Sequence, residues 1–216
     1  MSPKNPYPGI FIALEGLDGS GLSTQAKLLQ ENLRLSDIGA YATKEPTNNV
    51  IGGVIRGVLT GALNGLPSGC LQLLFAADRA HHLNREIIPQ LQEGKVIISD
   101  RYFWTSVAYG GVDLDREWLL EVNKNFIQPD LTIFLSVPVS TTMNRLKKDR
   151  FELELFEKEK ELEKILKNYD WLKRKFGGLI TEVEATGDRG EIAERILEKV
   201  KALGKFRKLE SLKKLK

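Results

Sequence analysis

A glycine-rich segment near the N-terminus constrains the fold of this chain more than any other feature. Residues 16–23 read Gly-Leu-Asp-Gly-Ser-Gly-Leu-Ser and match the pattern G-x-x-x-x-G-K-[ST] at every position except that of the lysine. The apolar residues 10–14 before it suit a buried strand, and Ala26, Leu29 and Leu33 after it repeat at helical spacing. A turn from strand to helix within a few residues requires backbone angles that glycine tolerates best. The segment therefore predicts a strand, a tight loop and a helix.

Such a loop points successive backbone N–H groups at one anion, and the positive end of the following helix adds to the attraction. We therefore expect the loop to bind nucleotide phosphates through Gly16, Leu17, Asp18, Gly19, Ser20, Gly21, Leu22, Ser23 and Thr24. The Ser23 hydroxyl is expected to reach a magnesium ion. Leu22 stands in the place of the lysine and supplies no charge. The alternative interpretation of this segment alone is a structural glycine turn.

The composition is that of a soluble globular protein in one domain covering residues 1–216. Apolar residues make up 42% and charged residues 28% of the chain. No apolar run approaches the roughly 18–20 residues needed to cross a bilayer, and residues 1–8 do not resemble a signal peptide. One cysteine, Cys70, indicates a reducing compartment, so we expect a cytoplasmic protein without membrane association. The adjacent His81 and His82 do not predict a zinc site.

The net charge of +3 is mild, and we expect no nucleic-acid partner. Its positive excess gathers in a basic C-terminal tail, roughly residues 203–216. The simpler interpretation of this tail is a solvated helix end, and the alternative is a patch for an acidic partner.

Strand-like and helical patterns alternate along the chain, which predicts an α/β fold with a parallel sheet covered by helices on both faces. The strand-like segments are residues 9–14, 40–44, 96–99, 131–137 and 179–184, and the clearest helical patterns cover residues 78–91 and 116–125. Because ligands of such sheets bind beyond the carboxyl ends of the strands, motifs at these ends are candidates for one shared site.

Two charged motifs follow strand-like segments. Pro46 keeps Glu45 out of helical geometry, so the end of the second strand can aim Lys44 or Glu45 into a cleft, although an ordinary strand-end turn explains it equally well. The pair Asp100 and Arg101 follows a buried apolar run, where charge is costly unless it is paired or functional. Asp100 is suited to a magnesium ion and Arg101 to a phosphate, and the alternative is a structural salt bridge.

An aromatic ring and a guanidinium share one helix face further along the chain. Phe75 and Arg79 are four residues apart, so one can stack on a nucleobase while the other donates to a ring carbonyl. Taken alone, Phe75 is better explained as a core residue. Tyr109 adds an aromatic side chain near a glycine pair.

Together these segments resemble the thymidylate kinase family over nearly the whole chain, from about Ile10 to Val200. The matching pieces, in the order of the family, are residues 15–21, 44–46, 75–79, 100–102, 108–109 and 128–131. Each piece is common, and the ordered set is specific. The resemblance implies a P-loop NTPase-type three-layer sandwich with a five-stranded parallel sheet and a small lid. It also implies transfer of the γ-phosphoryl group of ATP to dTMP, giving dTDP, with Mg2+ and in a homodimer.

The resemblance also implies roles for individual residues on the acceptor side. Phe75 looks like the ring that stacks on thymine, Arg79 like the donor to the base carbonyl, and Tyr109 like the residue against the deoxyribose. Ser106 matches a position that reaches the base edge in some members, and Lys44 and Glu45 match the acceptor side as well.

The remaining matched residues concern phosphate and metal. Arg101 looks like a contact to the dTMP phosphate, Asp18 like a group near the sugar or the acceptor, and Asp100 like a carboxylate on the metal side. Three positions depart from the family: Leu22 has no charge, Gly110 replaces a residue that is polar in many members, and Lys44 stands where arginine is common.

The segment at roughly residues 143–156 resembles the lid of the family. Arg145 and Arg150, helped by Lys147 or Lys148, are candidates to supply the charge that Leu22 lacks. The alternative is a solvated basic helix face. Losing one positioned donor typically costs about 2.7–4 kcal/mol in the transition state, so a nucleotide-binding homologue with little turnover and a regulatory role is the competing hypothesis. A kinase of another nucleoside monophosphate is a third, weaker one.

Overall fold

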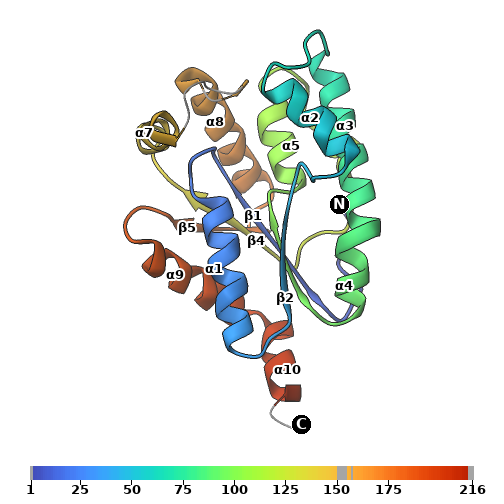
Figure 1. Ribbon diagram of the computed structural model, residues 1–216, viewed down its shortest axis with the longest axis vertical. Coiled ribbons are helices and arrows are strands. Elements are labelled where there is room, and N and C mark those ends of the chain that lie inside the picture. The colour runs from blue at the N-terminus through green and yellow to red at the C-terminus, as the bar shows by residue number, and fades with distance from the viewer. Residues whose placement is uncertain (1, 150–154, 157, 214–216) are drawn as a thin grey trace.

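The computed structural model describes residues 2–149, 155–156 and 158–213. Its centre is a five-stranded sheet in which all neighbouring strands run parallel, in the order β2-β3-β1-β4-β5 (Figure 1). The strands are β1 (Ile10–Gly16), β2 (Ala40–Lys44), β3 (Val96–Asp100), β4 (Leu131–Ser136) and β5 (Ile180–Glu184). The predicted five-stranded parallel sheet is confirmed. Because β1 lies between β3 and β4, the chain winds in opposite directions from it, and the carboxyl end of β1 is the crevice where ligands of such sheets bind.

Helices cover both faces of the sheet. In Figure 1, α1 and α9 lie to the left of β2, and α3 and α4 lie to its right. The helices before β4 are α1 (Leu22–Leu35), α2 (Val50–Leu59), α3 (Ser68–His82), α4 (Ile88–Gln92), α5 (Phe103–Gly110) and α6 (Arg116–Asn123), with a π-helical turn, η1 (Leu83–Ile87), joining α3 to α4. Those after it are α7 (Val139–Asp149), α8 (Glu159–Lys175), α9 (Arg189–Ala202) and α10 (Gly204–Lys213).

The apolar side chains of β1 alternate between two cores. Phe11 and Ala13 join the core under α5 and α8, whereas Ile10, Ile12 and Leu14 join the core under α1 and α9. A central strand buried on both faces reads as a continuous apolar run, which is what residues 10–14 show. The hydrophobic pattern therefore sets the layers, and the layers bring the charged strand ends together.

The helical pattern predicted for residues 78–91 is part of a longer unit, because α3, η1 and α4 follow one another from Ser68 to Gln92. The segment α2 was not predicted. One of its glycines is required by close packing, because a Cβ on Gly52 would overlap the Thr47 carbonyl. Among the described residues, no helix is long and apolar enough to cross a membrane.

Candidate active site

The glycine-rich loop joins the carboxyl end of β1 to the start of α1. Gly19 and Gly21 have φ angles of 77° and 99°, which favour glycine strongly. Gly16 is required for a different reason, since a Cβ there would lie 2.7 Å from the Ser20 hydroxyl oxygen. The three glycines thus let the loop fold back closely enough to present its backbone N–H groups at the N-terminus of α1.

Leu22, the residue in place of the lysine, turns toward the core. Its side chain is 5% exposed and belongs to the apolar cluster under α1 and α9, with Ala26, Leu29 and Val137. The side chain therefore contributes packing to the start of α1 and offers no charged group to a phosphate.

Arg145, on α7, holds the loop from outside. Its Nη1 donates to the carbonyl oxygens of Gly19 at 3.1 Å and Ser20 at 3.4 Å, and its Nη2 donates to Ala185 at 3.4 Å. Beside it lies a cavity of about 350 Å³ that includes Thr24 among its lining residues. Arg150, the other lid arginine predicted from the sequence, lies outside the described residues. Lys147 and Lys148 are exposed, and Lys148 lines the same cavity.

Ser23 and Asp100 meet where the predicted metal site should be. The Ser23 hydroxyl donates to Asp100 Oδ2. Burial raises the pKa of Asp100, and the neighbouring Arg101 and the Ser23 hydrogen bond offset part of that effect. Both residues line a cavity of about 440 Å³, together with the exposed Lys44, which pairs with Asp100 in the sheet register.

This donor set fits Mg2+, which prefers oxygen ligands and is held by one or two carboxylates plus substrate phosphates. In the part of the chain that the structure describes, no group of three or more His, Cys, Asp and Glu side chains is placed to hold a metal ion.

Arg101 connects the loop to the other half of the site. Its φ of 73° is strained for a residue with a side chain, and such outliers concentrate at functional sites. Its guanidinium donates to Asp18 Oδ1 at 2.6 Å, to the Gly16 carbonyl at 2.9 Å and to Thr105 Oγ1 at 3.3 Å. Burial opposes the charge, but Tyr109 and Asp18 outweigh it and hold the pKa of Arg101 above its usual range.

Some of the residues chosen from the sequence for the acceptor side meet at one small cavity of about 70 Å³, namely Asp18, Phe75, Arg101, Ser106 and Tyr109, whereas Lys44, Glu45 and Arg79 do not line it. It is lined by Asp18, Pro46, Leu59, Gln72, Phe75, Arg101, Thr105, Ser106, Tyr109 and Phe156. The Tyr109 hydroxyl donates to Asp18 Oδ2 at 3.0 Å and accepts from the Asp18 backbone N–H at 3.1 Å. An aromatic wall, a serine, a carboxylate and a guanidinium therefore face one space next to the loop.

Arg79 and Glu45 lie behind this cavity and do not line it. The Arg79 side chain is 1% exposed, and its Nε donates to Glu45 Oε2 at 2.9 Å. Its Nη1 donates to Asn123 Oδ1, and its Nη2 donates to Ser106 Oγ at 3.0 Å. Glu45 also faces His82, with its Oε1 3.2 Å from His82 Nδ1. Ser106 is the point where this buried cluster touches the cavity.

Gln72 is a cavity residue that the sequence analysis missed. Its side chain is 3% exposed, and its Oε1 has no hydrogen-bond partner among the described residues. It also explains Gly110, because a Cβ at that position would lie 2.8 Å from Gln72 Cδ. The Gln72 side chain thus fills the space beside Gly110, and no pattern in the sequence indicates this pairing.

Glu15, at the end of β1, is a second missed residue. Its carboxylate is fully buried and accepts from the Tyr102 backbone N–H at 3.1 Å, from Tyr169 at 3.0 Å and from Thr105. Burial raises the pKa of Glu15 from 4.5 to about 7, although Thr105 and Arg101 oppose the shift.

Glu15 makes stability depend on pH. Because its pKa is higher in the folded chain, its contribution is full below about 4.5 and is lost as the pH rises through about 7. The interval corresponds to about 3 kcal/mol of unfolding free energy. In urea titrations, the free energy of unfolding of wild type should fall by up to that amount between pH 5 and pH 8, compared with the change measured for Glu15→Gln. A difference between the two proteins that does not change with pH would contradict this explanation.

The comparisons with known proteins point to one family. The thymidylate kinase family profile matches residues 14–196. A probable thymidylate kinase of Thermococcus kodakarensis is 44% identical over 169 residues, covering 74% of this chain and 82% of the relative. Probable thymidylate kinase 1 of Saccharolobus solfataricus is 34% identical over 189 residues, covering 87% and 94%. A solved structure of thymidylate kinase from Candida albicans aligns with a TM-score of 0.79 at 26% identity, covering 92% of this chain and 93% of that one. The chain belongs to the thymidylate kinase family.

Proposed function

We propose that this protein transfers the γ-phosphoryl group of ATP to dTMP, giving dTDP. The observation that carries the proposal is the place of Arg101 and Asp18. Both line the acceptor cavity, and Arg101 is bonded to the Gly16 carbonyl of the glycine-rich loop. A donor phosphate on the loop and an acceptor phosphate in the cavity would therefore meet at one guanidinium, which is the positioning that phosphoryl transfer requires.

The charge that Leu22 lacks would come from arginines. Arg101 would face the transferred group from the acceptor side, and its planar fork suits phosphate oxygens. Arg145 donates a hydrogen bond to a carbonyl of the loop. It also lines the cavity beside the loop, into which ATP would extend. Arg150 is proposed as the third charge of the lid, on the ground of the family resemblance.

Mg2+ would be held by Ser23 and Asp100, with substrate phosphates completing its ligands. When bound, it would neutralise charge on the phosphate oxygens. The residues of the chain would supply position: the Ser23–Asp100 hydrogen bond keeps both oxygens on one side of the loop. Turnover that persists in excess EDTA would contradict this assignment.

In the acceptor cavity, Phe75 would stack on thymine and Tyr109 would pack against the deoxyribose. Ser106, held by Arg79, would face the base edge. The cavity of about 70 Å³ is smaller than usual ligand pockets, which measure roughly 300–1,000 Å³. A neighbouring cavity of about 360 Å³ shares Gln72, Tyr109 and Phe156 with it. Withdrawal of Phe156, whose ring packs edge-on against Tyr109 at 5.5 Å, would join the two spaces.

Gln72 is proposed to accept a hydrogen bond from a ring N–H of the base. Gln72→Leu preserves most of the side-chain volume but removes the acceptor, so kcat/KM for dTMP should fall about tenfold, mainly through KM. Gly110→Ala displaces the Gln72 amide without altering it and should act in the same direction. Steady-state kinetics with dTMP and ATP as the varied substrates test this proposal. An unchanged KM for dTMP in both variants would exclude a role for Gln72.

A homodimer is proposed because α2 and α3 expose apolar side chains that the described part of the chain leaves uncovered. Val50 is 85%, Val54 38% and Leu73 53% exposed. Light scattering should give twice the 24.3 kDa of one chain, and Leu73→Glu should shift the mass toward the monomer, whereas Leu35→Glu, at the end of α1, should not. A wild-type mass of 24.3 kDa would contradict the proposal.

The competing proposal, a nucleotide-binding homologue with little turnover and a regulatory role, rests on Leu22 alone. It predicts ATP binding without release of ADP in the presence of dTMP. The acceptor cavity favours the active enzyme, because the aromatic and charged side chains that line it next to the loop suit a second substrate.

A further inference from the structure

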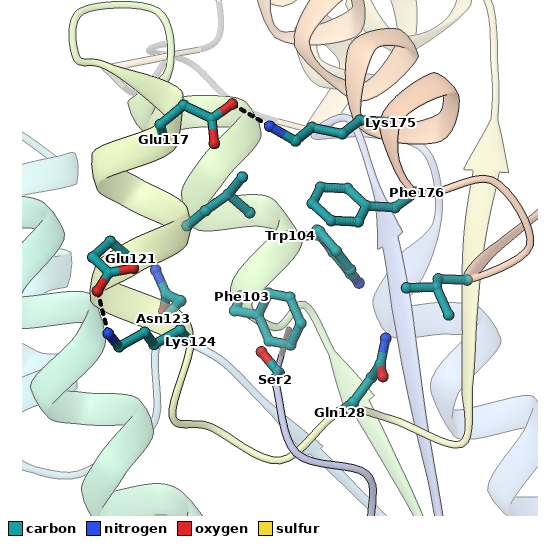
Figure 2. Close-up of a pocket in the computed structure, with 12 residues that line it drawn as sticks. Ser2, Phe103, Trp104, Glu117, Glu121, Asn123, Lys124, Gln128, Lys175 and Phe176 are labelled. Carbon is teal, nitrogen blue, oxygen red and sulfur yellow. Dashed lines mark hydrogen bonds and ion pairs between the residues drawn. The ribbon is translucent and has the colours of Figure 1, made fainter.

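A cavity of about 250 Å³ lies beside the start of α5, where it is lined by Phe103 and Trp104 (Figure 2). Its walls come from α5, α6 and the end of α8, and they include the aromatic side chains Phe103, Trp104 and Phe176. The Trp104 ring lies 4.5 Å from Phe103 and 5.0 Å from Phe176, measured between centroids, at tilts of 48° and 51°. Such a wall suits a flat, apolar molecule.

One polar group in this wall has no partner. Trp104 is 3% exposed, and its indole Nε1–H makes no hydrogen bond with the described residues. A buried donor without an acceptor costs about 1–3 kcal/mol, so an acceptor that enters the cavity gains this contact without breaking another. In Figure 2 the indole nitrogen lies on the side of the ring nearer Gln128, another residue of the wall.

The charged side chains at the rim of this cavity form two ion pairs of opposite charge. Lys175 pairs with Glu117, and Lys124 pairs with Glu121, as the dashed lines in Figure 2 show. These pairs leave a charged ligand no unpaired opposite charge among the four residues, whereas a neutral ligand needs none. The volume of about 250 Å³ is close to the lower end of ordinary ligand pockets, which suits a ligand of two fused rings.

The cavity is also connected to the acceptor cavity. Asn123 lines it and accepts a hydrogen bond from Arg79 Nη1, while Arg79 Nη2 donates to Ser106 at 3.0 Å. Ser106 lines the acceptor cavity, two residues after Trp104 on α5. One side chain, that of Arg79, therefore links a lining residue of one cavity to a lining residue of the other.

We propose that this cavity is a second binding site, for a neutral, planar heteroaromatic molecule with a carbonyl acceptor. The carbonyl accepts from Trp104 Nε1, and the rings lie against Phe103 and Phe176. The occupant steadies Asn123, which keeps Arg79 on Ser106 and favours dTMP binding. This last step rests on the proposed function, whereas the site itself does not.

Coumarin is the test ligand, because it is flat and neutral and carries a carbonyl acceptor but no donor. In a proton–nitrogen NMR spectrum of wild type, Trp104, Trp118 and Trp171 give the indole signals of the 3 tryptophans. Trp104→Phe identifies one of them. Coumarin should shift the Trp104 signal downfield and leave the partly exposed Trp118 unmoved.

Matched variants separate the hydrogen bond from packing. Trp104→Phe should weaken coumarin binding about 2- to 10-fold, Leu179→Phe should fill the cavity and abolish binding, and Trp118→Phe should change nothing. Naphthalene, which has the shape but no acceptor, should bind at least about threefold more weakly than coumarin. An unshifted Trp104 signal at millimolar coumarin, or equal binding to Leu179→Phe, would overturn the site.

The coupling is measured at equilibrium, where it must be reciprocal. Saturating dTMP should tighten coumarin binding about fivefold, and ATP should not. Equal coumarin affinity with and without bound dTMP would contradict the coupling between the two cavities but not the binding site itself. A protein that binds coumarin but not dTMP would point instead to failure of the proposed function.

Discussion

Replacing Arg101 with alanine should lower kcat for dTMP phosphorylation by a factor of about a thousand, equivalent to roughly 4 kcal/mol. The guanidinium is the group shared by the two halves of the site: it bonds the Gly16 carbonyl of the loop and the Asp18 carboxylate of the acceptor cavity. Its loss removes a positioned charge and leaves Asp18 with Tyr109 as its remaining hydrogen-bonded side-chain partner among the described residues. Single-turnover kinetics with bound ATP and dTMP would measure the chemical step directly.

Two further variants separate the guanidinium from the backbone. Arg101 has a φ of 73°, which glycine adopts without strain, so Arg101→Gly should lose the same activity as Arg101→Ala while unfolding at a higher temperature. Arg101→Lys keeps the charge but not the planar fork, so its kcat should lie between that of wild type and that of Arg101→Ala. Near-normal kcat in Arg101→Gly would show that the charge on the transferred group comes from elsewhere.

Leu22→Ala should lower the free energy of unfolding by about 2–4 kcal/mol and leave kcat within a factor of a few of wild type. The side chain is 5% exposed in the core under α1 and α9, so its removal leaves a cavity and takes no polar group from the site. Leu22→Lys restores the residue of the common loop pattern, but it places an ammonium group among apolar side chains. We expect it to destabilise the fold by a similar amount without raising kcat more than a few-fold.

Thermal unfolding and steady-state kinetics of the two Leu22 variants give both quantities. Leu29→Ala, at another buried position of α1, is the matched control for core packing, and it should cost a comparable free energy with unchanged kinetics. A rise of kcat by a hundredfold or more in Leu22→Lys would mean that the native site is impaired and that no other cation fills the role.

The layers of the fold were predictable because local sequence patterns define the strands and helices that form them. The apolar run at residues 10–14 and the alternation of strands with helices define a buried parallel sheet, and all five predicted strands are present within a few residues. The segment α2 was not predictable in this way, because it is short and contains three glycines, which disfavour a helix in the sequence pattern. Gly52 is dictated by the approach of the Thr47 carbonyl.

The contacts of the candidate site likewise fall into those that the sequence predicts and those that depend on packing. Strand ends converge in any parallel sheet, so the meeting of Ser23 with Asp100 and of Asp18 with Arg101 follows from the motif positions. The burial of Arg79 and the filling of the space beside Gly110 by Gln72 depend on packing between α3, α5 and α6, which no local pattern encodes. For Leu22 the sequence showed the missing charge but not the inward direction of the side chain.

The most direct test of the central proposal is release of ADP by the wild-type protein with Mg2+ and ATP, using dTMP, dUMP and dGMP as separate acceptors. We expect turnover with dTMP at a kcat of about 1 per second or more, the lower end for enzymes of this kind, and weaker turnover with the other two. ATP binding measured by calorimetry without ADP release for any acceptor would contradict the proposal and favour a nucleotide-binding homologue without kinase activity.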